Sequence, residues 1–119
     1  MISLAPPGRV YLATGYTDMR KAINGLSLLV SEQLGHDPFD GSLFVFCNKG
    51  RDKLKILHWQ HNGFWLYYRR LEKGKFKWPK VTESTDSIVL SYRELGWLLD
   101  GLSLLQSQSH PAVFGLENN

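Results

Sequence analysis

The sequence predicts an α+β domain in which an antiparallel β-meander of about four to five strands has one helix before it and one after it. Three observations support this. Apolar residues recur at helical spacing near the start of the chain, short aromatic and β-branched segments separated by Gly-containing turns follow, and a second capped helical pattern comes last. With 119 residues, of which 43% are hydrophobic, the chain suits one domain. We expect that domain over residues 1–102 and a polar C-terminal tail over residues 103–119.

The first expected elements are a short strand, Arg9 to Ala13, and a helix within TDMRKAINGLSLLVSEQLG, residues 17–35. Apolar residues spaced four, three, four and four positions apart form one stripe along this helix. Thr17 or Asp18 would cap its first turn, and Gly35 would end it. The stripe consists of Met19, Ile23, Leu26, Val30 and Leu34.

A run of strands joined by tight connections is expected next. The Asn62-Gly63 pair between two apolar segments is a strong local signal for a hairpin, because both residue types tolerate positive φ. A polar stretch, residues 80–87, then leads to the last helix. The expected strands are Ser42 to Cys47, Lys53 to Gln60, Phe64 to Leu71 and Lys75 to Trp78.

The last helix is expected from Tyr92 to about Leu99. Ser91 followed three positions later by Glu94 is the pattern of a capping box, in which each side chain satisfies a backbone N–H of the other residue. Gly101 would end the helix.

Positive charge is concentrated in one part of the chain. Residues 49–80 contain ten Lys or Arg residues and two acids, whereas the rest of the chain contains four bases and nine acids. A local positive field attracts polyanions even though the net charge of the whole chain is only +3. Many of these cations fall in the expected hairpin loops, where folding does not require them.

Strand alternation divides the central hairpin into two faces. One face would be core and carries Leu57, Trp59, Phe64, Leu66 and Tyr68. The other face mixes aromatic rings, hydrogen-bonding groups and cations. It is too apolar to be simply exposed to water, so we expect it to be covered or to bind a partner. This second face carries Ile56, His58, Gln60, Trp65, Tyr67 and Arg69, and the next hairpin adds Leu71, Phe76 and Trp78.

Three interpretations compete for the second face. The rings could be covered by the last helix or a dimer mate, they could stack on bases beside phosphate-binding cations, or they could form a protein-binding patch. The basic loops favour nucleic acid. The candidate nucleic-acid-binding residues are Arg51, Lys53, Lys55, Trp65, Tyr67, Arg69, Arg70, Lys73, Lys75, Lys77 and Trp78.

Catalytic chemistry is not indicated, and we expect no enzyme, no metal site and no cofactor. No acidic residue falls within an expected strand, so the convergent carboxylates of a two-metal enzyme are missing. His58 and His61 are three apart, which on a strand puts them on opposite faces. Cys47, flanked by apolar residues, is expected to be buried. No signal peptide or membrane-spanning run is visible, which predicts a cytoplasmic protein.

Four segments resemble, in order and spacing, the small TnpB-type (second open reading frame) accessory proteins of bacterial insertion sequences in the IS-sixty-six group. The resemblance covers roughly residues 1–102. It implies a role in transposition alongside a separate, larger transposase that carries the strand-transfer chemistry. The segments are TDMRKAINGL (17–26), LFVFCNKGRDKLKILHW (43–59), GFWLYYRRLEKGKFKWP (63–79) and ELGWLLDGL (94–102).

Residues and resemblance together predict a non-catalytic accessory protein of transposition that binds DNA through a basic, aromatic hairpin surface. The main alternative is a protein-protein adaptor for the transposase without direct DNA contact, and an RNA-binding module is a third option. The expected partners are DNA and the transposase of the same element, with a homodimer left open and no membrane involved.

Overall fold

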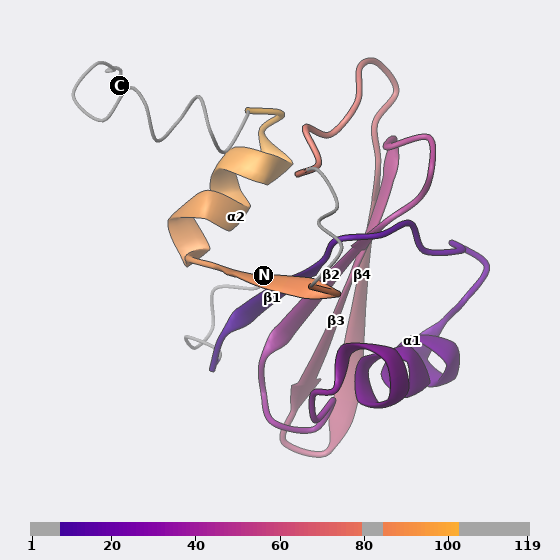
Figure 1. The fold of residues 1–119 in the computed structure, drawn as a ribbon, viewed down its shortest axis with the longest axis vertical. Coiled ribbons are helices and arrows are strands. Elements are labelled where there is room, and N and C mark those ends of the chain that lie inside the picture. The colour runs from indigo at the N-terminus through magenta and orange to yellow at the C-terminus, as the bar shows by residue number, and fades with distance from the viewer. Residues whose placement is uncertain (1–7, 80–84, 103–119) are drawn as a thin grey trace.

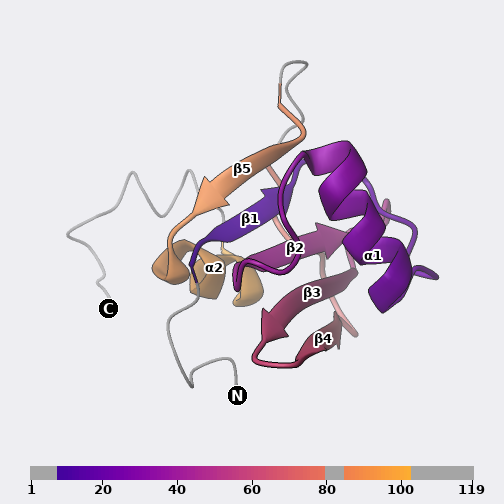
Figure 2. The same ribbon diagram turned by 90° about the horizontal axis from the view of Figure 1, so that it is seen from below.

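Five strands form one mixed sheet in the order β4-β3-β2-β1-β5 (Figures 1 and 2). The structure is a computed structural model that describes residues 8–79 and 85–102. β1 runs parallel to β2, and every other neighbouring pair is antiparallel. The strands are β1 (Val10–Ala13), β2 (Leu43–Cys47), β3 (Lys53–Gln60), β4 (Gly63–Arg70) and β5 (Ser87–Leu90).

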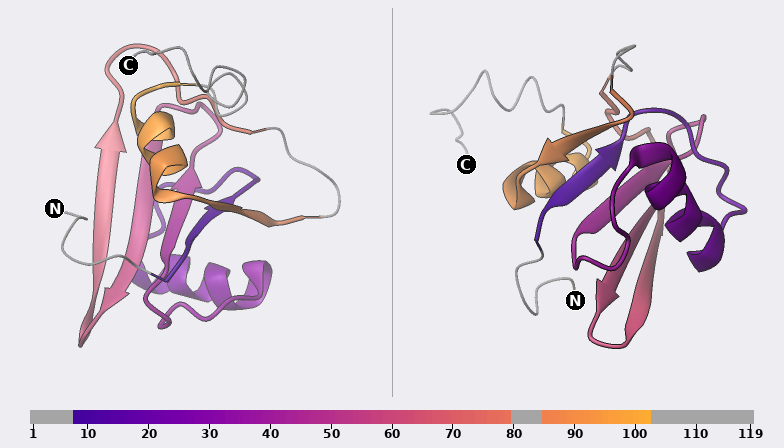
Figure 3. Two further views of the ribbon diagram at one scale, coloured as in Figure 1. Left: turned by 90° about the vertical axis from the view of Figure 1, so that its left-hand side faces the viewer. Right: turned by 60° about the horizontal axis from the view of Figure 1, so that its bottom comes forward.

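Helices cover both faces of this sheet. On one face lies α1 (Ile23–Leu29), which continues directly into the π-helical turn η1 (Val30–Leu34). On the other lies α2 (Tyr92–Leu99), which follows β5 after a single residue (Figures 1 and 3). β2 is buried along its whole length, because it lies between the two helical layers.

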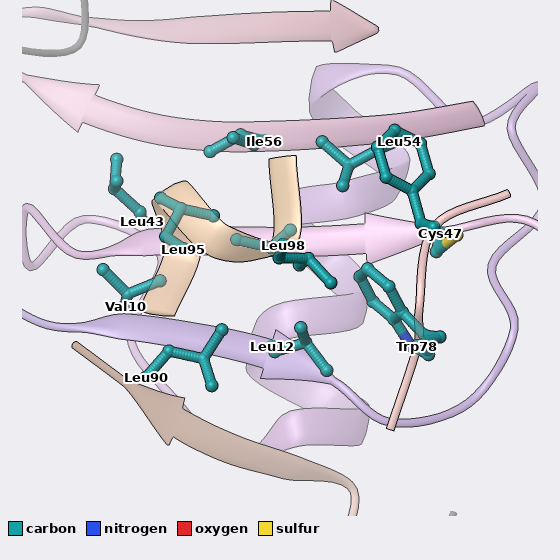
Figure 4. Close-up of a cluster of buried hydrophobic side chains, with 12 residues drawn as sticks. Val10, Leu12, Leu43, Cys47, Leu54, Ile56, Trp78, Leu90, Leu95 and Leu98 are labelled. Atoms are coloured by element: carbon teal, nitrogen blue, oxygen red, sulfur yellow. The ribbon is translucent and has the colours of Figure 1, made fainter. Parts of the chain in front are cut away.

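Each face has its own hydrophobic cluster. On the α1 face, Leu26 and Val30 pack with Phe44, Phe46 and Leu57 from the sheet. On the α2 face, shown in Figure 4, Leu95 and Leu98 of α2 meet side chains from β1, β2, β3 and β5. Those side chains include Val10, Leu12, Leu43, Val45, Leu54, Ile56 and Leu90. The α2-face cluster also contains two aromatic residues that follow β4.

The structure confirms the α+β class and the meander of β2, β3 and β4. The first strand, the end of the first helix at Gly35 and the extent of the last helix agree with the sequence prediction. The capping box is present: the Ser91 N–H donates to Glu94 Oε1 at 2.8 Å, and the Glu94 N–H donates to Ser91 Oγ at 3.0 Å. Gly101 has a left-handed φ of 83°, which ends this helix.

The predicted start of the first helix, at Thr17 or Asp18, is wrong. α1 begins at Ile23, and the cap position is Ala22. Thr17 instead donates its N–H to the Cys47 carbonyl at 2.8 Å, while Asp18 accepts the N–H of Arg20 at 2.9 Å. Both residues therefore lie in a loop, which Thr17 fastens to the end of β2 through its backbone and in which the Asp18 side chain forms a local turn.

Two strand predictions are also corrected. Residues 75–78 form no strand, although both of their aromatic side chains are buried. β5, which the sequence prediction missed, pairs with β1 in the register Tyr11↔Val89 and Leu12↔Ile88. Its four residues are too few for a clear alternating pattern, so its pairing depends on the neighbouring strand.

Within the described ranges, no helix has the length and apolar character needed to cross a membrane. The expected tail, residues 103–119, and most of the polar stretch, residues 80–84, lie outside the described residues.

Candidate nucleic-acid interface

The β3–β4 hairpin carries several of the predicted binding residues. The strands pair in antiparallel register around a turn at His61 and Asn62. Tyr67 packs against the α2-face cluster, and side chains alternate along a strand, so Trp65, Tyr67 and Arg69 share that face. β4 is an edge strand of the sheet, which leaves this row beside open solvent.

Two basic loops lie side by side where β3 begins and β4 ends (Figure 1). Backbone hydrogen bonds join them: the Leu71 N–H donates to the Asp52 carbonyl at 2.8 Å, and the Phe76 N–H donates to the Arg51 carbonyl at 2.7 Å. The loops and the adjoining strand ends therefore gather cations that are up to 28 positions apart in the chain. We call this group the basic end of the sheet: Lys49, Arg51, Lys53, Arg69, Arg70, Lys73, Lys75 and Lys77.

Asn48 holds the first of these loops in one shape. Its Oδ1 accepts the N–H groups of Asp52 at 3.1 Å and Lys53 at 3.0 Å, and its Nδ2 donates to Asp52 Oδ1 at 2.8 Å. The hydrogen bond from Asn48 lowers the pKa of Asp52, so this carboxylate remains ionised within the loop. The cations on this loop are thus presented by a backbone that is already ordered.

Most cations of the basic end are accessible to an anion. Arg70 donates to Glu72 at 2.9 Å, which raises the pKa of Arg70, and Lys53 Nζ lies 3.8 Å from Asp52. Exposed pairs of this kind contribute little energy, so a phosphate can compete for either cation. Three lysines are exposed and form no ion pair with any residue in the described ranges: Lys73, Lys75 and Lys77.

Lys55 does not belong to this accessible set. Its Nζ donates to the carbonyl oxygens of Met19 at 2.8 Å and Lys21 at 2.7 Å, and it lies 5.8 Å from the centre of the Tyr68 ring. These contacts fasten the loop before α1 to the sheet. The structure therefore places Lys55 in a supporting position.

Trp78 is buried in the α2-face cluster, with 8% of its surface exposed (Figure 4). Its Nε1–H donates to the Ala13 carbonyl at 3.0 Å. In this position the indole has no free face for a base, which corrects the expectation that Trp78 lies on the binding surface. The physical reason is that the segment after β4 folds back over the sheet, so that Phe76 and Trp78 join the α2-face cluster and the Trp78 indole reaches Ala13 of β1.

Trp65 remains accessible, with 50% of its surface exposed. Its Nε1–H donates to Gln60 Oε1 at 2.9 Å, and its ring stacks on Tyr67 with the centroids 6.1 Å apart. Arg69 lies four positions after Trp65 along the strand, which corresponds to about 13 Å. The ring and the basic end therefore occupy different parts of β4.

An open groove beside the basic end was not predicted from the sequence. It has a volume of about 660 Å³ and lies between the loop before α1 and the loop after β2. Tyr68 was expected in the core but is 54% exposed in this groove, and Tyr16 is 57% exposed. The sequence did offer a signal for Tyr16: it is an aromatic residue within the turn-like stretch ATGYTD, where a ring is expected at the surface. Arg20, Lys49 and Lys53 also line the groove.

The groups most suited to catalysis are placed apart from one another. Burial raises the pKa of the Cys47 thiol to about 11, so it is not an activated nucleophile. His58 is buried on the α2 face, whereas His61 is exposed in the hairpin turn. Among the described residues, no group of three His, Cys, Asp or Glu side chains is arranged to hold a metal ion.

Comparisons with known proteins find one family model and two relatives that match this chain. The family model described as "IS66 Orf2 like protein" matches residues 8–109. The uncharacterized protein y4hO of Sinorhizobium fredii (strain NBRC 101917 / NGR234) is 39% identical over 94 residues, which cover 79% of this chain and 80% of that protein. The uncharacterized protein y4jC of the same strain is 35% identical over 103 residues, covering 87% and 86%. No solved structure matches the chain.

Proposed function

The chain belongs to the IS66 Orf2-like family of insertion-sequence accessory proteins, and from that premise we propose that it binds DNA through the basic end of its sheet. In this role the protein holds phosphates of the element's DNA while the separate transposase performs the strand transfer. The basic end supplies positioning contacts, since Lys and Arg contacts to phosphate fix a protein on DNA without reading its sequence.

One observation carries this proposal: two loops that hydrogen-bond to each other gather eight cations, accompanied by the acids Asp52 and Glu72, at one end of the sheet. The free energy of folding offsets the repulsion between these like charges, because the loop backbones are hydrogen-bonded to one another. DNA binding at a surface of this kind gains free energy because the Lys and Arg side chains displace counterions that are condensed on the DNA phosphates.

The test is a titration of a labelled DNA duplex at several salt concentrations. We expect the affinity of the parent protein to fall linearly with salt on a log-log plot. The double variant K73Q/K75Q should weaken binding at every salt concentration and reduce the magnitude of the slope by about 0.9 for each phosphate that is no longer bound. R9Q/R93Q removes the same charge from exposed positions outside the basic end and should leave the slope nearly unchanged.

Two outcomes contradict the proposal. Equal effects of the two double variants would mean that only net charge matters. Unchanged DNA binding in K73Q/K75Q, combined with loss of transposase binding in Trp65→Ala, would favour the adaptor alternative. The exposed Trp65 ring, stacked on the half-buried Tyr67 on an edge strand, is the surface that such an adaptor would offer.

A further inference from the structure

We propose that the groove between the loop before α1 and the loop after β2 binds unpaired nucleotides of a single DNA strand, with Tyr16 and Tyr68 stacking on their bases. This inference rests on the proposed DNA-binding function and specifies which form of DNA the protein binds. We call this site the tyrosine groove. Its walls carry Tyr16, Tyr68, Arg20, Lys49 and Lys53.

The two tyrosines have the exposure that stacking requires. Tyr16 is 57% exposed and Tyr68 is 54% exposed, and both line the same groove of about 660 Å³. Base-aromatic stacking needs a free base face, which a base inside a duplex does not offer because its neighbours already occupy both sides. Exposed rings in an open groove therefore favour unpaired bases over duplex DNA.

The charges of the groove suit a phosphate backbone. Lys49 is exposed and forms no ion pair with any residue in the described part of the chain, and Lys53 has only a long pair with Asp52, at 3.8 Å. The acid Asp18 is neutralised by Arg20, whose guanidinium donates to both carboxylate oxygens at 2.7 to 3.1 Å. The lining therefore has a positive balance although it includes a carboxylate.

Both walls of the groove are ordered before any ligand arrives. Thr17, which is buried, donates its N–H to the Cys47 carbonyl at 2.8 Å, and Lys55 holds two carbonyls of the same loop. The opposite wall is the loop shaped by Asn48. Binding then requires little ordering of the protein, which is a main cost of association.

The tyrosine groove is continuous with the basic end, because Lys49 and Lys53 belong to both. A strand that leaves a duplex held at the basic end would pass these lysines as it enters the groove. The site thus fits DNA in which a duplex adjoins an unpaired segment.

The experiment measures binding of four labelled probes: a single strand, the matching duplex, the duplex with a single-stranded overhang, and a single strand of RNA. We expect Y16A/Y68A to bind the single strand and the overhang about tenfold or more weakly, and the duplex within about twofold of the parent. Y16F/Y68F keeps both rings and should bind like the parent. Lys49→Glu, an exposed substitution in the same groove, should also weaken binding of the single strand.

Trp65→Ala is the matched control, because it removes an exposed ring outside the groove. The inference is overturned if Y16A/Y68A binds the single strand like the parent, if it loses duplex binding equally, or if Trp65→Ala shows the larger loss. Tighter binding of RNA than of DNA would overturn the DNA assignment. In each of these cases a salt-dependent effect of K73Q/K75Q on the duplex would still support the proposed function, whereas absence of binding to any probe would reject both.

Discussion

Trp65 and Trp78 show that the same side chain serves different purposes at two positions of one basic segment. Trp78 fills the α2-face cluster and satisfies its N–H with the Ala13 carbonyl. Trp65 lies half-exposed on the edge strand and satisfies its N–H with a neighbouring glutamine. Burial, and not residue type, therefore decides which ring contributes to stability.

Substituting the two tryptophans should separate these roles. Trp78→Ala leaves a cavity in a packed cluster and should lower the free energy of unfolding by about 3 to 5 kcal/mol. Trp65→Ala removes a ring at the surface and should change it by about 0.5 kcal/mol. Urea unfolding monitored by far-UV circular dichroism measures both. Similar losses for the two variants would mean that Trp65 is also buried in solution.

His58 is a buried imidazole whose Nδ1 has no hydrogen-bond partner among the described residues. Burial lowers its pKa from the usual 6.5, and a hydrogen bond with the Gly41 backbone opposes this only in part. The folded state therefore takes up this proton at lower pH than the unfolded state does. The resulting stability is complete above about pH 6.5 and declines as the pH falls below it.

We expect the free energy of unfolding of the parent to fall more steeply between about pH 7 and about pH 5 than that of His58→Gln, which has no imidazole at this position. Urea titrations at a series of pH values measure the difference. His61→Asn removes the exposed imidazole of the hairpin turn and should keep the steep dependence, since His58 is retained. Identical pH profiles for the parent and His58→Gln would show that His58 does not contribute.

At the scale of elements, the late start of α1 follows from a contact with β3. The Lys55 ammonium donates hydrogen bonds to the carbonyl oxygens of Met19 and Lys21. A continuous helix would use these carbonyls for its own backbone hydrogen bonds. The Asp18 carboxylate is engaged with Arg20, which lowers the pKa of Asp18 to about 2. The loop that results forms one wall of the tyrosine groove.

Lys55→Met should therefore destabilise the protein by about 1 to 3 kcal/mol, because two hydrogen bonds from a charged donor are removed while the apolar stem is kept. Lys49→Met, at an exposed position, is the control and should change stability by about 0.5 kcal/mol or less. Urea unfolding compares the two. Equal stability of both variants would show that the loop before α1 does not depend on Lys55.

At the scale of the whole molecule, the sheet has covered central strands and an exposed basic end. Helical layers cover the central strands on both faces, so β2 is wholly buried and offers no surface. The strand ends beside β4 are left uncovered, and the cations gather there. This arrangement places a strong local positive field on a protein of small net charge, which favours fast encounter with a polyanion.

The sequence by itself determined the features that depend on neighbouring residues. The class of fold, the β3–β4 hairpin, the capping box at Ser91, the glycine ends of both helices and the concentration of cations in the loops could all be predicted. Each arises from side-chain periodicity, turn chemistry or charge within a few positions, where the physical rules are local.

Only the tertiary structure decided which side chains are buried, because burial depends on segments that are distant in the chain. The Trp78 indole meets a carbonyl 65 positions away, and Lys55 reaches a carbonyl 36 positions away. The pairing of β5 with β1 and the placement of Tyr16 and Tyr68 in the lining of one groove also depend on segments that are distant in the chain. No local pattern records such contacts, since their energy comes from desolvation and hydrogen bonding between surfaces that exist only after folding.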